Sequence, residues 1–160
     1  MKKIKLTLGK KATVDDEDFK YLNKWNWYAS KGYNTFYAVR MSGKPRRAIL
    51  MHRLILKTPK EKDVDHIDGN GLNNQKTNIR NCTRSQNLYN QYRKNSCGFK
   101  GIRKIVINCS KKTYCYYVSR IMVMGKGYYL GCFKTPTSAA IAYNNAAIKY
   151  HKGFAKLNIM

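Results

Sequence analysis

The chain has 160 residues, of which 43% are hydrophobic and 12% aromatic, so it is neither wholly disordered nor collagen-like. Its 32 Lys and Arg against 8 Asp and Glu give a formal net charge of +24. Nucleic acid is the first candidate partner, since a polyanion offsets the self-repulsion of such a charge. No apolar run approaches the roughly 20 residues of a membrane span, and the N-terminus lacks the apolar core of a secretory signal, so we expect no membrane partner.

The charged residues are unevenly distributed. All eight acids lie at or before Asp68, whereas the segment from Gly69 to Met160 contains 16 Lys and Arg and no carboxylate side chain. The C-terminal half is therefore suited to lie along phosphates, and any chemistry that needs carboxylates must use the N-terminal half. The five cysteines are odd in number and include no C-x-x-C pair, which favours reduced thiols over a zinc site.

Residues 1–60 are predicted to form an N-terminal leader with a short helix and a β-hairpin. Four consecutive acids at 15–18 precede an apolar-periodic run that begins at Phe19, which is typical of a helix N-terminus, with a metal-binding acid cluster as the alternative. Aromatic and β-branched runs on both sides of Gly32 predict the hairpin. Residues 48–56 predict a strand that runs into a short helix.

The middle of the chain is polar and rich in Asn, which favours turns and side-chain caps over a conventional core. Within it, residues 89–98 hold no aliphatic core residue and are predicted to be a linker. Residues 99–160 regain a periodic pattern. Strands are predicted at 101–107, 114–124 and 128–133, and a helix that begins near Thr135 has small residues on one face, which would let it lie close to a sheet.

Residues 61–88 carry the most informative motif: the pair Asp65-His66, then Asp68-Gly69-Asn70, Asn78-Ile79-Arg80 and Ser85-Gln86-Asn87. In order and approximate spacing this segment resembles the HNH nuclease family, whose fold is two antiparallel strands and a helix that hold one divalent metal. The resemblance implies an α+β protein with a ββα-metal nuclease core at 61–88. The alternative is a turn-rich Asn segment with a structural Asp-His pair.

The residues of this segment suit phosphodiester hydrolysis. Asp65 and His66 are neighbours on a strand and point to opposite faces, so they can serve one site only if the strand is curved or lies over a metal. Asp65 and the side-chain carbonyl of Asn87 are the predicted ligands of Mg²⁺ (or Mn²⁺), an arrangement that would leave several waters on the ion. His66 is the predicted general base, and Asn78 matches the family residue that orients the catalytic His.

Other polar residues near the motif leave alternatives open. Asp68 is expected to form a turn with Gly69 rather than to bind a metal, and Asn74, like Asn70 and Asn73, is expected to be loop scaffolding. His52, in a His-Arg pair before the motif, is expected to be packed or capping, with a second metal or phosphate role as the alternative.

Residues 99–160 resemble the ethylene-response-factor type of DNA-binding domain, a three-stranded antiparallel sheet with one packed helix. The matching runs are Gly101–Arg103, Tyr117–Ile121, Tyr129–Phe133, Ala139–Ala147 and Phe154–Asn158. In that family the outer face of the sheet enters the major groove. The resemblance implies that Arg103, Arg120 and Tyr129 contact bases, and that Lys104 and Lys112 contact phosphates.

Together these features predict a site-directed DNA endonuclease of the homing or phage type, with one divalent metal ion per HNH site. Its expected partner is double-stranded DNA, bound by a monomer or a DNA-assembled dimer in the cytoplasm of a bacterial or phage-infected cell. The alternative is a DNA-binding regulator whose HNH fold is a non-catalytic scaffold. An RNA-binding protein would explain the charge but not the predicted metal site.

Overall fold

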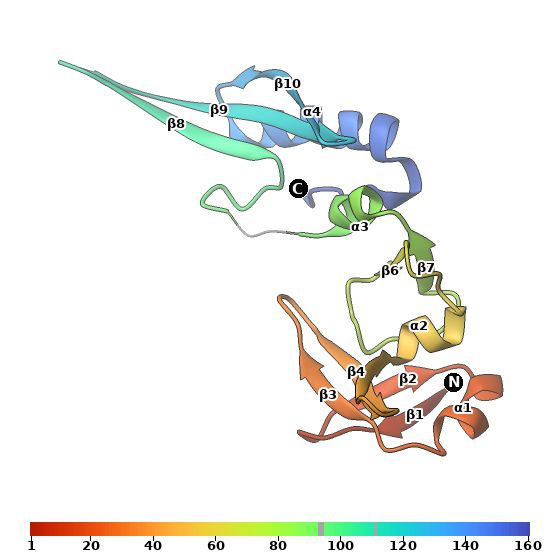
Figure 1. Cartoon of the computed structure of the whole chain (residues 1–160). Coiled ribbons are helices and arrows are strands. Elements are labelled where there is room, and N and C mark those ends of the chain that lie inside the picture. The colour runs from red at the N-terminus through yellow and green to blue at the C-terminus, as the bar shows by residue number, and fades with distance from the viewer. Residues whose placement is uncertain (93–94, 111) are drawn as a thin grey trace. The chain divides into compact units, whose positions relative to one another are not determined.

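A computed structural model describes residues 1–92, 95–110 and 112–160 (Figure 1). The chain divides into two compact units, Met1–Asn87 and Leu88–Met160. The expected leader and the expected nuclease segment therefore share one unit. Both units combine antiparallel sheets with few helices, which confirms the predicted α+β class.

The first unit contains three antiparallel sheets and short helices. One sheet pairs β1 (Lys2–Lys5) with β2 (Lys11–Val14), and a second has the order β3 (Tyr28–Lys31), β4 (Phe36–Ser42), β5 (Arg47–Leu50). The third pairs β6 (Asp63–His66) with β7 (Ile79–Cys82). The helices are α1 (Asp16–Leu22), α2 (Met51–Leu56) and α3 (Arg84–Asn90), and the boundary between the units falls within α3.

The leader holds the loop that follows β6 by hydrogen bonds distant in sequence. Thr13 donates its amide to the carbonyl of Leu72 and accepts from the amide of Asn74, both at 2.8 Å. One carboxylate oxygen of Asp15 accepts from the backbone amide of Lys76 at 2.8 Å. Since this loop lies between the two strands of the HNH motif, the leader helps to set the geometry of the candidate site.

The run of acids at 15–18 begins a helix, as predicted. Asp15 is the N-cap residue of α1, and the next three acids occupy its first turn, where carboxylates interact favourably with the helix dipole. Within the described ranges, no group of three or more His, Cys, Asp or Glu side chains is arranged to hold a metal ion. The acid run therefore has a structural explanation.

The second unit is a three-stranded antiparallel sheet with one packed helix. Its strands β8 (Ile102–Cys109), β9 (Lys112–Val123) and β10 (Lys126–Phe133) lie in the order β10-β9-β8 and are followed by α4 (Pro136–His151). The N-cap of α4 is Thr135, whose hydroxyl accepts from the amide of Ser138 at 3.1 Å. Alanines on α4 pack against Ile102 and Ile121, because small side chains let the helix approach the sheet closely.

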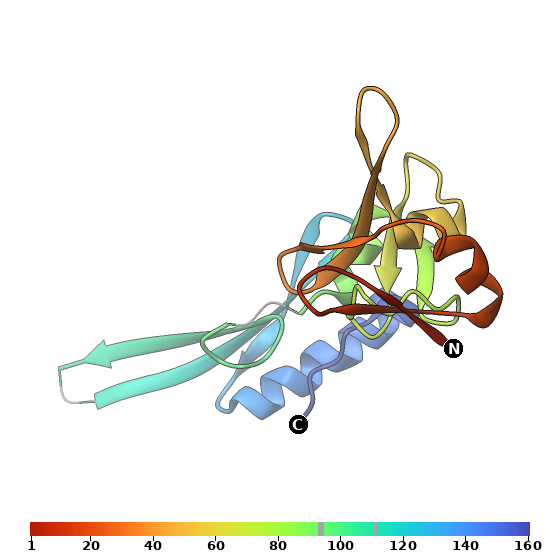
Figure 2. The ribbon, with the colours of Figure 1, turned by 90° about the horizontal axis from the view of Figure 1, so that it is seen from below.

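The β8–β9 hairpin extends beyond the rest of its sheet (Figure 2). Strand β10 pairs with β9 only as far as Tyr117, whereas β8 pairs with β9 out to Lys112. The distal part of the hairpin is therefore a two-stranded ribbon. In the parts of the chain that the structure describes, no helix has both the length and the apolar composition needed to cross a bilayer.

The structure differs from the linker expected at 89–98, because the described residues of that segment bond within the second unit. The ring of Tyr89 stacks on His151 with 3.7 Å between centroids, and its hydroxyl accepts from the amide of Met124 at 2.7 Å. Asn95 donates to the carbonyl of Ile102 at 3.1 Å. Polar side chains thus hold the segment without an aliphatic core, while residues 93 and 94 lie outside the described residues.

Candidate functional site

The candidate site is built on the short β6–β7 pair and on α3. The two strands are antiparallel, with Asp63 opposite Cys82, Asp65 opposite Arg80 and His66 opposite Ile79. Because side chains alternate along a strand, Asp63 and Asp65 project from one face and His66 from the other. This arrangement divides the conserved chemistry of the motif into an acidic side and an imidazole side.

On the acidic side, Asp63 lies between the two predicted metal ligands. The amide nitrogen of Asn87 donates to an oxygen of Asp63 at 3.3 Å, and a guanidinium nitrogen of Arg84 lies 3.3 Å from the same oxygen. The structure thus gives Asn87 a direct contact with Asp63, two residues before Asp65. Sequence reasoning missed Asp63, although its spacing from Asp65 was a usable signal.

Asp65 is almost fully buried and forms an ion pair with Arg80. Its side chain is 4% exposed, and one of its oxygens accepts from Nε of Arg80 at 2.9 Å and from a terminal guanidinium nitrogen at 2.7 Å. The register explains this contact, because Arg80 is the residue directly opposite Asp65 on β7. A positive charge therefore already accompanies this carboxylate in the folded chain.

The donor set on this side fits a hard divalent cation. Two carboxylates, of Asp63 and Asp65, and the amide oxygen of Asn87 are the oxygen ligands that Mg²⁺ and Mn²⁺ prefer. The guanidinium of Arg80 shows that Asp65 accommodates a cationic partner in this environment.

On the other side, His66 belongs to a buried group of rings. Its centroid lies 5.0 Å from that of His52, in an edge-to-face arrangement, and 5.9 Å from that of Tyr37. Burial lowers the pKa of His66, while a hydrogen bond to Asn74 and the charges of Asp68 and Asp65 oppose this shift. The net effect favours a neutral imidazole, which is the form that can accept a proton.

Asn74 fixes one edge of the His66 ring. Nε2 of His66 and the side-chain oxygen of Asn74 are 3.4 Å apart, and in the tautomer with its proton on Nε2 the histidine donates. Asn74 is fully buried, and its amide nitrogen donates to the carbonyl of Leu72 at 3.3 Å. Sequence reasoning treated Asn74 as loop scaffolding, because nothing local separates it from the other asparagines.

Asn78 bonds to the turn after His66. Its side-chain oxygen accepts from the amide of Asp68 at 3.1 Å, and its nitrogen donates to Asp68 at 3.0 Å and to the carbonyl of Asn73 at 2.8 Å. Its carbonyl also accepts from the amide of Ile67 at 2.9 Å. These contacts fix the backbone immediately after the histidine, so they orient it through the chain.

Asp68 caps this turn, in agreement with the expectation that it is a turn former. One oxygen accepts from the amide of Asn70 at 2.7 Å, and the other accepts from the side chain of Asn73 at 2.8 Å. Burial raises its pKa, but the hydrogen bonds from Asn73, Asn70 and Asn78 outweigh burial and hold the pKa below its ordinary value. A carboxylate used in this way is committed to the loop.

The candidate DNA-binding residues lie in the second unit. Tyr129 is directly opposite Arg120, and Arg103 is opposite Val118, two residues away from Arg120 on β9. The register therefore places Arg103, Arg120 and Tyr129 on one face of the sheet. Lys104 projects from the other face, and the strand position of Lys112 is at the far end of the β8–β9 hairpin.

Comparisons with known proteins agree with this geometry. The HNH endonuclease family matches residues 57–89, which include β6, β7 and most of α3. An uncharacterised HNH endonuclease of Acanthamoeba polyphaga mimivirus is 32% identical over 153 residues, an alignment that covers 94% of this chain and 75% of the relative. No solved structure matches the chain. Because the similarity to this relative extends over nearly the whole chain and includes the motif, the protein belongs to the HNH endonuclease family.

Proposed function

We propose that this protein is a divalent-metal-dependent endonuclease that hydrolyses phosphodiester bonds of duplex DNA at preferred sites. The observation that supports it best is the division of β6 into two faces. Oxygen donors from Asp63, Asp65 and Asn87 gather on one side, and a buried histidine lies on the other. Family membership alone would not distinguish an active nuclease from an inactive scaffold.

In this proposal Asp65 and Asn87 hold one Mg²⁺ or Mn²⁺ ion, and Asp63 lies beside them. When bound, such an ion stabilises negative charge on the scissile phosphate and on the leaving oxygen. His66 accepts the proton of the attacking water. With a proton on Nε2 directed at Asn74, Nδ1 carries the lone pair that takes up this proton. Asn78 keeps the turn after His66 in place, so that the ring does not drift.

The second unit is proposed to direct the enzyme to its target. Its outer sheet face presents Arg103, Arg120 and Tyr129, and the unit contains no carboxylate side chain. We assign direct base contacts to the two arginines, since an arginine that pairs with guanine contributes roughly 1–3 kcal/mol of discrimination. Lys104 and Lys112 are assigned to phosphates. One nuclease site per chain suits nicking by a monomer or double-strand cleavage by a DNA-assembled dimer.

A plasmid relaxation assay tests the proposal. Supercoiled plasmid is incubated with the full chain in Mg²⁺, in Mn²⁺ and in EDTA, and open-circular and linear products are separated on a gel. We expect conversion with either metal and none in EDTA. Full activity in EDTA would exclude the metal-dependent mechanism. Duplex binding without cleavage under any metal condition would instead favour a DNA-binding regulator with a non-catalytic HNH scaffold.

A further inference from the structure

The first unit carries a strongly basic segment of its own. Between Phe19 and Lys60 there is no acidic residue, although all eight acids of the chain lie in its first 68 residues. The basic residues of this segment are Lys20, Lys24, Lys31, Arg40, Lys44, Arg46, Arg47, Arg53, Lys57 and Lys60. The proposed division of labour, in which the second unit binds DNA, does not explain this charge.

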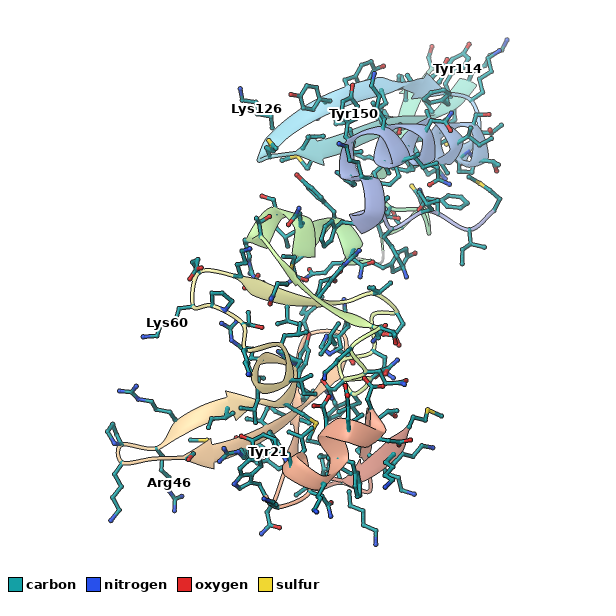
Figure 3. The ribbon with its side chains drawn as sticks, turned by 90° about the vertical axis from the view of Figure 1, so that its right-hand side faces the viewer. Tyr21, Arg46, Lys60, Tyr114, Lys126 and Tyr150 are labelled. Atoms are coloured by element: carbon teal, nitrogen blue, oxygen red, sulfur yellow. The ribbon has the colours of Figure 1, made fainter. Side chains whose placement is uncertain are left out.

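Several of these cations lie on the β4–β5 hairpin. Strand β3 pairs with β4 only as far as Val39, so the pairs from Arg40–Ile49 to Ser42–Arg47 form a ribbon of two strands without a third. We call residues 40–47 the basic finger. Its loop residues Lys44 and Arg46 are exposed, as is Arg47. Figure 3 shows the hairpin extending from the first unit with the side chain of Arg46 directed away from it.

Arg40 lies at the base of the basic finger and is held by aromatic rings. Its guanidinium carbon is 4.3 Å from the ring centroid of Trp25 and 5.7 Å from that of Trp27. Its Nε is buried without a hydrogen-bond partner among the described residues. Stacking fixes the planar group but leaves its N–H donors available, and a phosphate oxygen is a suitable acceptor for them.

The acids of the first unit pair with other groups. Among the described residues, ion pairs join Asp16 to the N-terminus, Glu17 and Asp18 to Lys76, Asp65 to Arg80, and Asp63 to Arg84. None of these ion pairs includes a cation of the basic finger. An exposed ribbon with several unpaired cations is suited to an extended anionic partner, and a two-stranded ribbon is narrow enough for the major groove of a duplex.

We propose that the basic finger is a second DNA-binding surface, which contacts the phosphates that border a groove of duplex DNA. The proposal rests on the proposed function, since the duplex is the one that the nuclease cuts. Phosphate contacts position a protein on DNA without reading its sequence. The basic finger would thus hold the nuclease unit on the backbone, whatever bases the second unit recognises.

The test compares two triple variants of the full chain with equal loss of charge. In the finger variant Lys44→Ala, Arg46→Ala and Arg47→Ala are combined. In the control variant Lys3→Ala, Lys5→Ala and Lys11→Ala remove exposed lysines of β1 and β2. Binding to a fluorescent duplex of about 30 base pairs is measured by anisotropy, in EDTA to prevent cleavage, from low to high salt. Circular dichroism melting confirms that all three proteins are folded.

Each lost phosphate contact is expected to reduce the slope of log K against log salt by about 0.9. Over the decade between 1 M and 0.1 M salt this slope corresponds to roughly eightfold in affinity per contact at 0.1 M. We therefore expect the finger variant to bind at least about eightfold more weakly with a shallower slope, and the control variant to lose much less. Equal losses in the two variants would mean that net charge alone matters, and would overturn the proposal.

The outcomes separate this proposal from the proposed function. If the wild type cuts and binds duplex DNA but the finger variant keeps its affinity and salt slope, the finger proposal is wrong and the nuclease stands. If the wild type fails to bind duplex DNA, or if the basic finger contributes only to binding of a single-stranded RNA competitor, the basic finger has no role in duplex binding. Absence of wild-type cleavage in Mg²⁺ or Mn²⁺ would count against the nuclease, not against the basic finger.

Discussion

Replacing His52 by glutamine should remove a specific part of the pH dependence of stability. His52 is 6% exposed, and its Nδ1 has no hydrogen-bond partner among the described residues. Burial lowers its pKa from 6.5 to about 3, and the positive charges of His66 and Arg53 contribute in the same direction. The folded chain therefore holds a neutral His52 at pH values where the unfolded chain protonates it.

The sign and the magnitude follow from this difference. Between pH 6.5 and about 3 the unfolded state binds a proton that the folded state does not, so the free energy of unfolding falls as the pH falls below 6.5. The limiting slope is about 1.4 kcal/mol per pH unit for one histidine. Integrated with these two pKa values, the loss between pH 7.5 and 5.5 is about 1.4 kcal/mol.

Urea unfolding of the metal-free chain measures this loss. The two tryptophans, Trp25 and Trp27, both lie in the first unit, so their fluorescence reports the unfolding of that unit. Between pH 7.5 and 5.5 the wild type should lose about 1.4 kcal/mol more than His52→Gln, because the other buried histidine of the unit is common to both proteins. An identical pH dependence in the two proteins would show that His52 is protonated or accessible in the folded state, and would refute this reasoning.

Other changes test the site and the packing. His66→Ala should reduce plasmid nicking by about two to four orders of magnitude while duplex affinity stays within a few-fold, since a general base acts in the transition state; nicking at the wild-type rate would contradict this role. Asp65→Ala or Asn87→Ala should abolish nicking or shift it to higher Mg²⁺ concentration, and an unchanged metal titration would remove that residue from the ligand set. Gly101→Ala should destabilise the second unit by about 2 kcal/mol or more, because the new Cβ would lie 2.2 Å from a buried tyrosine ring at a φ of +77°. At Gly125, with φ +79° and open space, the same change should cost only about 1 kcal/mol, and equal melting shifts for the two variants would show that the clash is relieved.

The sequence predicts most where local chemistry determines structure. The strands of the second unit follow from alternating apolar residues and glycine turns, and the start of α4 follows from a threonine cap and a proline. The opposite orientation of Asp65 and His66 follows from the period of a strand, and the structure confirms it. In each case the determining residues lie within a few positions of each other.

Long-range contacts explain what the sequence does not predict. The bonds of Thr13 to the loop after β6 join residues about 60 positions apart, and no local pattern marks them. Asn74 differs from its neighbouring asparagines only because the fold buries it beside His66. Asp63 gains its place through a contact with Asn87 on a separate helix. These positions acquire their roles from tertiary packing, which a single sequence does not encode in spacing.

The ion pair between Asp65 and Arg80 bears on how folding and the proposed metal binding are related. A carboxylate that is 4% exposed would be costly to bury without a positive partner, and Arg80 supplies one from the opposite position on β7. The fold therefore does not need a metal ion to neutralise this charge. It follows that metal and guanidinium share or compete for the same carboxylate, so the site binds its ion less tightly than a site with no internal cation. Chelation should stop the proposed reaction while the first unit stays folded, which separates this site from structural metal sites whose ion is needed for folding.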